Sequence, residues 1–121
     1  MAKVRSRGNR STEHVVEMAL RRARIRDWSK HRQDVPGKPD FYFQHAKLAV
    51  FVDGCFWHGC PVCSRRVPRH RRVFWLSKLT ANLKRDARVR RKLRRLGYKT
   101  IRIWEHELRN DKWLRRLRAK L

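Results

Sequence analysis

Apolar residues recur at helical spacing in the first part of the chain, from about residue 13 onward. Ser11 or Thr12 can cap a helix that begins near Glu13. The stripe that would face a core consists of Val15, Val16, Met18, Ala19, Leu20 and Ala23. Because the arginines of this segment lie largely off the stripe, the pattern predicts an amphipathic helix that ends near residues 27–29. Residues 1–10 are expected to form a flexible basic arm.

Short apolar or alternating runs further along the chain predict strands. Phe41–Phe43 and Lys47–Val52 are separated by a short polar segment and predict a hairpin, which follows the turn Pro36-Gly37-Lys38-Pro39. The second run is apolar without alternation, as expected of a strand that is covered on both faces. Residues 98–104 alternate and predict a third strand.

The longest helical pattern lies between the second and third strands. It runs from about Val73 to Leu96, and Gly97 is well placed to end it. Asp111 can cap a short last helix, whose inward positions are Trp113, Leu114 and Leu117. The order of elements predicts one α/β domain over residues 11–121, with a small mixed sheet between helices.

The charge of the chain narrows the class of its partner. There are 34 Lys and Arg residues against 10 Asp and Glu, so the formal net charge is +24. Such a charge repels itself, and a polyanion relieves the repulsion, so nucleic acid is the first candidate. Disorder is disfavoured by the 40% hydrophobic residues and five tryptophans. An RNA-binding protein of ribosomal type and a protein of anionic membrane surfaces remain open, but no stretch is apolar enough to span a bilayer.

All three cysteines, Cys55, Cys60 and Cys63, lie within nine residues. Clustered thiols without an export signal are better interpreted as metal ligands in a reducing compartment than as a disulfide framework. Zinc is typical of such a site, which would be structural once a fourth ligand closes it. The spacing leaves that ligand open among His58, His70, His14, His31, His45 and His106. Buried or reactive free cysteines are the alternative.

Acidic residues are scarce in this chain, so their positions are informative. Asp40 stands at the start of one predicted strand, and Asp53 stands at the end of the next. A helix packed on that sheet can bring Glu17 beside them. Carboxylates gathered in this way bind Mg²⁺, which can assist phosphodiester hydrolysis. The alternative is that Glu17 pairs with a neighbouring arginine and Asp40 only caps the turn.

Several motifs, taken in order, are similar to those of one enzyme family. They are PGKPDF at 36–41, VFVDGCFWHGCP at 50–61, Phe74-Trp75, Asn82-x-x-Arg85-Asp86, Leu96-Gly97-Tyr98 and IWEHEL at 103–108. The chain resembles the very short patch repair (Vsr) DNA mismatch endonucleases from about residue 11 to about residue 115. The block from Gly54 to Cys60 is the most specific part of the resemblance.

The resemblance implies a restriction-endonuclease-like fold of the PD-(D/E)XK superfamily and a Mg²⁺-dependent enzyme. Such enzymes nick double-stranded DNA on the 5′ side of the thymine in a T:G mismatch. By position, Asp40 matches the Mg²⁺-binding aspartate, and the backbone carbonyl of Val52 can complete the metal shell. His58 matches the histidine that assists the attacking water, and Glu17 matches a glutamate of the first helix.

The same resemblance assigns the cysteine segment and its surroundings. Cys55, Cys60, Cys63 and His106 match the ligands of a structural Zn²⁺. The aromatic residues that would intercalate beside the mismatch are Phe56, Trp57 and Trp75. Insertion there is favoured because a mismatched step is weakly stacked. The basic segment 64–72 is expected on the surface against DNA, through Arg69, Arg71 and Arg72.

The resemblance also implies partners and a location. It points to a monomer in the bacterial cytoplasm, associated with the nucleoid and without membrane contact. A cytosine methyltransferase and mismatch-repair proteins would be functional partners.

Departures from the family pattern leave other functions open. Asp53 stands where the best-known members have a catalytic histidine, so its catalytic role is a hypothesis. The segment before Pro36 is short for the family, which predicts that a strand or turn is missing there. A non-catalytic zinc-containing nucleic-acid-binding protein is one alternative. A related nuclease of a restriction or mobile-element system is another.

Overall fold

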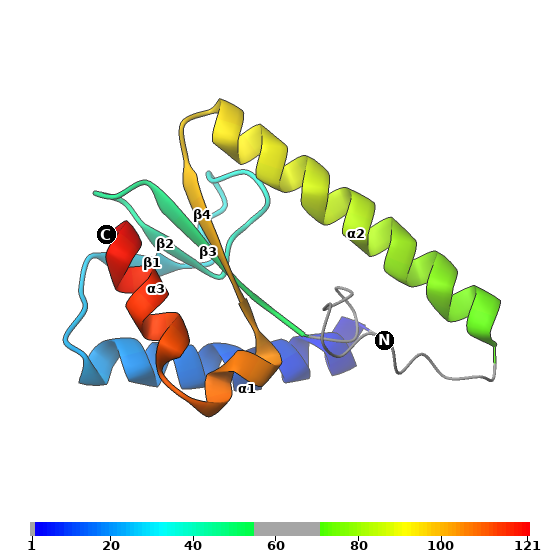
Figure 1. The fold of residues 1–121 in the computed structure, drawn as a ribbon, viewed down its shortest axis with the longest axis horizontal. Coiled ribbons are helices and arrows are strands. Elements are labelled where there is room, and N and C mark those ends of the chain that lie inside the picture. Colours follow the sequence, from blue (N-terminus) through cyan, green and yellow to red (C-terminus); the bar gives the residue numbers. More distant parts are fainter. Residues whose placement is uncertain (1, 55–70) are drawn as a thin grey trace.

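The computed structural model describes residues 2–54 and 71–121 of the chain, and in the first helix it describes side chains from Thr12 onward. The elements are α1 (Ala2–Arg22), β1 (Trp28–Lys30), β2 (Phe41–Phe43), β3 (Leu48–Asp53), α2 (Arg72–Arg95), β4 (Lys99–Trp104), the 3-10 helix η1 (Glu105–Arg109) and α3 (Lys112–Lys120). They form a mixed α/β fold (Figure 1). None of the helices in the described part is long and apolar enough to cross a membrane.

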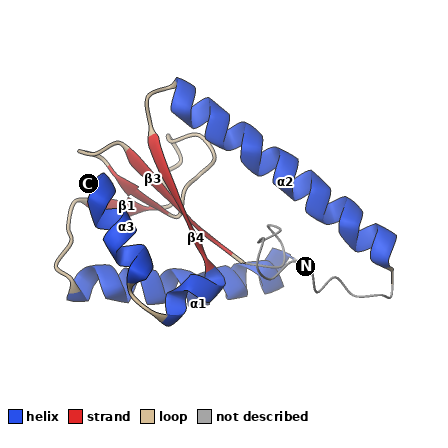
Figure 2. Cartoon of the chain, in the orientation of Figure 1, coloured by secondary structure: helices blue, strands red, loops and turns tan. Residues whose placement is uncertain are grey.

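The four strands make one mixed sheet in the order β1-β2-β3-β4 (Figure 2). β2 and β3 are antiparallel neighbours, so the predicted hairpin is confirmed. β4 runs parallel to β3, and its register pairs Asp53 with Trp104. A parallel pair needs a long crossover connection, and α2 lies within that connection. As a result, β3 and β4 end at the same edge of the sheet.

Side chains alternate between two cores, one on each face of the sheet. The larger core combines the sheet with α1 and α3 and contains Val16, Leu20, Phe41, Phe43, Leu48, Val50, Val52, Ile101, Ile103, Trp113 and Leu117. The smaller core, on the α2 face, contains Val35, Tyr42, Ala49 and Leu93, with Phe51, Val89 and Tyr98 packed against it. β3 contributes to both cores, which confirms the prediction of a strand covered on both faces.

The sequence pattern missed the edge strand β1. Its three residues, Trp28–Lys30, pair antiparallel with Phe41–Phe43. The sequence has no apolar run here that would indicate a strand. The strand forms instead through edge pairing with β2 and through one aromatic contact. The Trp28 ring packs edge-to-face on Phe41 with centroids 5.5 Å apart. The segment before Pro36 therefore does contain a strand.

The first helix also differs from the pattern at both ends. It begins at Ala2 instead of near Glu13, so the backbone of residues 2–10 is helical where an arm was expected. No proline interrupts residues 2–22, and a cap at Ser11 or Thr12 is therefore unnecessary. The helix ends at Arg22 instead of residues 27–29, and Arg24 and Asp27 have positive φ values of 56° and 71° that turn the chain toward β1.

The turn before Asp40 packs directly against α2. Gly37 has a φ of +81°, and a Cβ atom built there would lie 2.4 Å from Cγ1 of Val89. A glycine meets both demands, because it tolerates positive φ and has no side chain. This close approach fixes the turn between the sheet and α2, immediately before the first candidate site residue.

We expect Gly37→Ala to lower the free energy of unfolding by roughly 1–3 kcal/mol, since it adds left-handed strain and a steric clash. Urea denaturation measures the change. Gly54→Ala is the matched control, because its Cβ would meet nothing closer than 3.9 Å and its φ is not positive. Equal stabilities of the two variants would contradict the packing described for the turn.

Candidate active site

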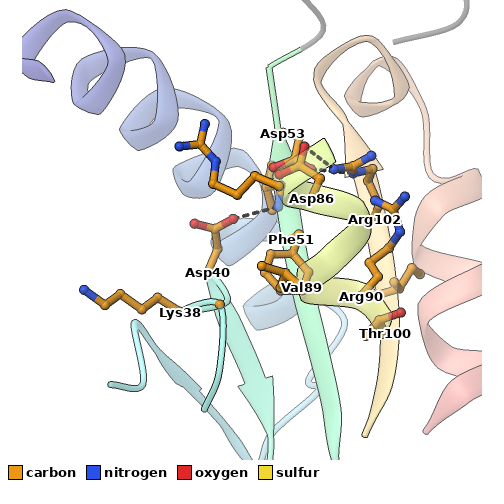
Figure 3. Close-up of a pocket in the computed structure, with 13 residues that line it drawn as sticks. Lys38, Asp40, Phe51, Asp53, Asp86, Val89, Arg90, Thr100 and Arg102 are labelled. Atoms are coloured by element: carbon orange, nitrogen blue, oxygen red, sulfur yellow. Dashed lines mark hydrogen bonds and ion pairs between the residues drawn. The ribbon is translucent and has the colours of Figure 1, made fainter. Parts of the chain in front are cut away.

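Asp40 is anchored by three backbone contacts where the turn enters β2. Its N–H donates to the carbonyl of Val50 at 2.9 Å, and its own carbonyl accepts from the N–H of His31 at 3.3 Å. Its Oδ2 accepts from the N–H of Val52 at 2.7 Å (Figure 3). The carboxylate is therefore held in one orientation by the neighbouring strand β3, as a ligand or catalytic group must be.

Glu13 and His31 lie beside Asp40. Nε2 of His31 is 3.1 and 3.0 Å from the two carboxylate oxygens of Glu13. One ligand atom from each of Glu13, His31 and Asp40 lies within 4.8 Å of the others. Glu13 is buried, whereas the imidazole of His31 is 55% exposed. The group thus combines a buried carboxylate, a partly buried one and a side chain that reaches solvent.

The electrostatics of this group favour an added positive charge. Burial raises the pKa of Asp40 to about 8, with the hydrogen-bonded side chain of Glu13 as the next cause. The Val52 N–H opposes the rise by stabilising the charged form. Two adjacent carboxylates cannot both ionise in a partly dry site without a cation or a shared proton. Asp40 therefore retains its proton near neutral pH unless a cation replaces it.

The geometry and the donor types fit a divalent metal ion. Oxygen ligands at about 2.1 Å from an ion lie about 3 Å apart at right angles and about 4 Å apart across it. The Glu13, His31 and Asp40 ligand atoms all lie within 4.8 Å of one another, an upper bound somewhat wider than this spacing. Carboxylates suit Mg²⁺ and Mn²⁺, while imidazole suits zinc and other transition metals. The donor set fits a divalent cation without selecting one.

Glu17, expected beside Asp40, is held elsewhere. Its carboxylate contacts Arg21 at 2.8 Å and Lys30 at 2.9 Å. The hydrogen bonds from Lys30, then from Arg21, lower its pKa. This is the pairing that the sequence left open as the alternative to a metal site. The structure places Glu13, one turn earlier on the same helix, next to Asp40 instead.

Glu13 and His31 were missed as members of this group for identifiable reasons. The sequence pattern made Glu13 the first residue of a helix, and considered His31 only as a zinc ligand. A signal for Glu13 did exist. It lies four residues before Glu17, and positions i and i+4 share a helix face, so either residue could face Asp40. The sequence could not show which turn of the helix packs at that point.

Asp53 ends β3 in a different arrangement. Nε of Arg102 donates to Asp53 Oδ2 at 2.6 Å, and Nη2 of the same arginine donates to Asp86 Oδ2 at 2.7 Å (Figure 3). Arg102 thereby ties the ends of β3 and β4 to α2. The expectation that Asp53 and Asp40 lie near each other is met, since both line one pocket. Asp53 is bound to Arg102, however, and lies outside the Glu13–His31–Asp40 group.

The other predicted residues divide into two sets. The zinc ligands Cys55, Cys60 and Cys63, the catalytic His58, and the DNA contacts Phe56, Trp57 and Arg69 lie outside the described residues. His106 lies in η1 immediately after β4. Because β3 and β4 end together, His106 is at the sheet edge where the chain leaves β3 toward Cys55. Its role as a zinc ligand stays a prediction.

Three predicted DNA contacts lie at the start of α2. Arg71 and Arg72 are exposed, and Trp75 is partly buried with its ring edge-to-face on Phe74 at 5.1 Å. The guanidinium of Arg71 lies over the Phe74 ring, 4.2 Å from its centroid. The structure thus groups basic and aromatic side chains at the helix start, and their contact with DNA stays a prediction.

Comparison with known proteins gives consistent relatives. A family model described as DNA mismatch endonuclease Vsr matches residues 1–64. The type II nicking enzyme V.NaeI of Lentzea aerocolonigenes is 39% identical over 111 residues, which are 85% of this chain and 66% of that protein. The type II nicking enzyme V.XorIIP of Xanthomonas oryzae pv. oryzae is 37% identical over 108 residues, which are 89% of this chain and 78% of that protein.

The DNA mismatch endonuclease Vsr of Escherichia coli is 39% identical over 75 residues, which are 62% of this chain and 48% of that protein. The chain therefore spans about two thirds of the length of V.NaeI and about half of the length of Vsr. The matched residues 1–64 include Glu13, His31 and Asp40. On the family match and the identity to these relatives, the chain belongs to the Vsr family of DNA endonucleases.

Proposed function

We propose that this protein is a Mg²⁺-dependent endonuclease that nicks one DNA strand on the 5′ side of the thymine in a T:G mismatch. The observation that carries the proposal is the pair of Asp40 and Glu13 in a chain of net charge +24. Among the described residues no lysine or arginine contacts either carboxylate, although 34 are present in the sequence. Because no lysine or arginine of the described residues occupies this carboxylate site, the site is suited to a metal cation from solution.

Each residue of the site has a defined task in this proposal. Asp40 and Glu13 would hold the metal ion, and the Val52 N–H keeps the Asp40 carboxylate oriented. The Val52 carbonyl, as first predicted, would be a further ligand. Bound Mg²⁺ supplies charge stabilisation to the phosphodiester and lowers the pKa of a bound water. His58 would move the proton of the attacking water, as the family resemblance implies.

Selectivity for the mismatch is assigned to aromatic side chains. Phe56, Trp57 and Trp75 would insert beside the T:G pair, where unstacking costs less than at a paired step. Asp53, bound to Arg102, would position the end of β3 instead of binding metal. The restriction-endonuclease-like fold that the family implies agrees with the mixed sheet between helices.

A structural zinc site would complete the fold of the cysteine segment. Cys55, Cys60 and Cys63, with His106 from the end of β4, are its proposed ligands. The zinc would fix Phe56, Trp57 and His58 relative to the sheet and would not activate water. We further propose that the enzyme acts as a monomer in the bacterial cytoplasm, alongside a cytosine methyltransferase and mismatch-repair proteins.

A second candidate function is strand nicking within a restriction system. It is favoured by the relatives V.NaeI and V.XorIIP, which are described as type II nicking enzymes. In this case the chemistry at Asp40 is unchanged and only the biological context differs.

The proposed activity predicts cutting of one strand of a T:G duplex in Mg²⁺, with little cutting of a matched duplex or of single strands. We expect Asp40→Asn to abolish cutting and to retain duplex binding, because it removes the negative charge of a metal ligand and keeps the shape of the side chain. Denaturing gel electrophoresis of end-labelled strands measures cutting, and fluorescence anisotropy measures binding. Equal rates for parent and variant would exclude Asp40 from the mechanism.

The geometry predicts unequal effects for the two glutamates of α1. We expect Glu13→Gln to slow single-turnover nicking on the order of 10–100-fold or more, as for other changes that weaken a metal site. Glu17→Gln should have the smaller effect, because that carboxylate is engaged by Arg21 and Lys30. The opposite order of rates would restore Glu17 as the metal-site residue and remove Glu13.

The raised pKa of Asp40, about 8, predicts a pH-dependent stability. Between about pH 4 and pH 8 the folded metal-free protein keeps a proton on Asp40 that the unfolded chain has lost. The contribution of Asp40 to the free energy of unfolding is therefore greatest at low pH. It falls as the pH rises through this range, by at most about 1.4 kcal/mol per pH unit. Urea denaturation in EDTA measures the slope.

Asp40→Asn is the control for that slope, because it lacks the titrating carboxyl. The difference in unfolding free energy between parent and variant should shrink or change sign from pH 5 to pH 8. Added Mg²⁺ should stabilise the parent more at pH 8 than at pH 6, since the metal competes with the proton. A difference that does not vary with pH would contradict the raised pKa.

A further inference from the structure

A pocket of about 460 Å³ lies between the sheet and α2. β3 and β4 form its floor, the middle of α2 forms its wall, and the turn of Gly37 and Lys38 lies at one side (Figure 3). Asp40 and Val52 line its edge. The pocket therefore opens next to the candidate metal site, but on the opposite side of the sheet end from Glu13, which α1 supplies.

The charges that line this pocket are only partly balanced. Asp53 and Asp86 both bind Arg102, at 2.6 and 2.7 Å. Two further arginines and one lysine line the pocket, namely Arg85, Arg90 and Lys38. The side chain of Arg85 donates to Asn82, a neutral partner. The lining thus holds four cationic side chains against the three carboxylates of Asp40, Asp53 and Asp86.

Arg90 is the unusual member of this lining. Its Nη1 is buried and has no hydrogen-bond partner among the described residues. Burial and the nearby charge of Arg102 lower its pKa, although an arginine stays protonated. A buried charged donor without a partner is unfavourable, and such groups are rare in folded proteins. Arg90 also lines the pocket, and phosphate oxygens are preferred acceptors for guanidinium groups.

We propose that this pocket binds one phosphodiester group of the nicked DNA strand, through the guanidinium group of Arg90, with Lys38 and Arg85 adding positive charge. The inference rests on the proposed function and adds a subsite to it. A phosphate held here would fix the strand so that a nearby phosphodiester lies at Asp40, since Asp40 borders the same pocket. Arg90 would be a positioning residue and would not take part in the chemistry.

The test measures coupling between Arg90 and individual phosphates. A T:G duplex is prepared with one neutral methylphosphonate linkage, moved stepwise along the nicked strand, and binding is measured by anisotropy in EDTA so that no cutting occurs. For the parent protein we expect one linkage near the nick to weaken binding about tenfold, the usual size of a charge-assisted hydrogen bond. For Arg90→Met, a methylphosphonate at that same linkage should not weaken duplex binding any further.

Arg91→Met is the matched control, because Arg91 is the next residue of α2 and is exposed. Arg91→Met removes the same charge, so its effect on the binding free energy should simply add to that of the methylphosphonate at every linkage. If Arg90→Met is also additive at every linkage, the subsite proposal is wrong.

A folding control separates this role from a structural one. Arg90→Met removes a half-buried charge with one buried donor that has no hydrogen-bond partner among the described residues, and it keeps much of the side-chain volume, so the melting temperature of the free protein should not fall by much. A large fall would show that Arg90 is a structural partner within the protein and would overturn the proposal. Inorganic phosphate and a short phosphorylated dinucleotide, titrated into the parent, should shift the Arg90 side-chain signals in NMR spectra.

Absence of those shifts would also count against the pocket. Inorganic phosphate binding as tightly as the duplex would show a free-anion site instead of a strand subsite. The outcomes for the two proposals are distinguishable. If the parent nicks T:G duplexes but shows no coupling at Arg90, the pocket fails alone. If coupling is present but no duplex is nicked in Mg²⁺, the proposed enzyme activity fails and the subsite stands.

Discussion

The structure depends on the contact between two carboxylates, Asp40 and Glu13, that the fold holds together in a partly buried site. α1 delivers Glu13 because Val16 and Leu20 on the same helix are buried against the sheet. The turn before β2 delivers Asp40, and the Val52 N–H fixes it from β3. The packing of helix and sheet therefore holds two carboxylates close enough to repel each other when both are ionised. A proton relieves this repulsion in the metal-free protein, and a divalent cation would relieve it in the metal-bound protein.

That conflict stands out because other carboxylates of the chain are paired with basic residues. Glu17 binds Arg21 and Lys30, Asp34 binds Arg32, and Glu107 binds Arg116. Asp53 and Asp86 share Arg102. In the described part of the chain, the basic partner of Glu13 is His31, at 3.0 Å. The arginine excess thus neutralises acids that shape the fold, and leaves the Asp40 site available to an ion from solution.

The sequence predicts the features that arise from local pattern better than those that depend on tertiary contacts. The long periodic α2 and the apolar β3 followed from local pattern, because many residues contribute to each. β1 did not, because three half-polar residues become a strand only by pairing with Phe41–Phe43. Asp40 followed from its motif. Glu13 and Glu17 share one helix face, so only the packing of α1 against the sheet could decide which carboxylate meets Asp40.

The two layers of the fold meet at the end of β3, and this gives them separate tasks. On one side, α1 brings a carboxylate to Asp40 and so favours a cation. On the other side, α2 brings Arg90 and Arg85 to the pocket that Asp40 borders, and so favours an anion. A phosphodiester strand carries the anions, and its hydrolysis needs the cation. Asp40 and Val52 stand between the two, because at this sheet end residues of both layers approach the same backbone.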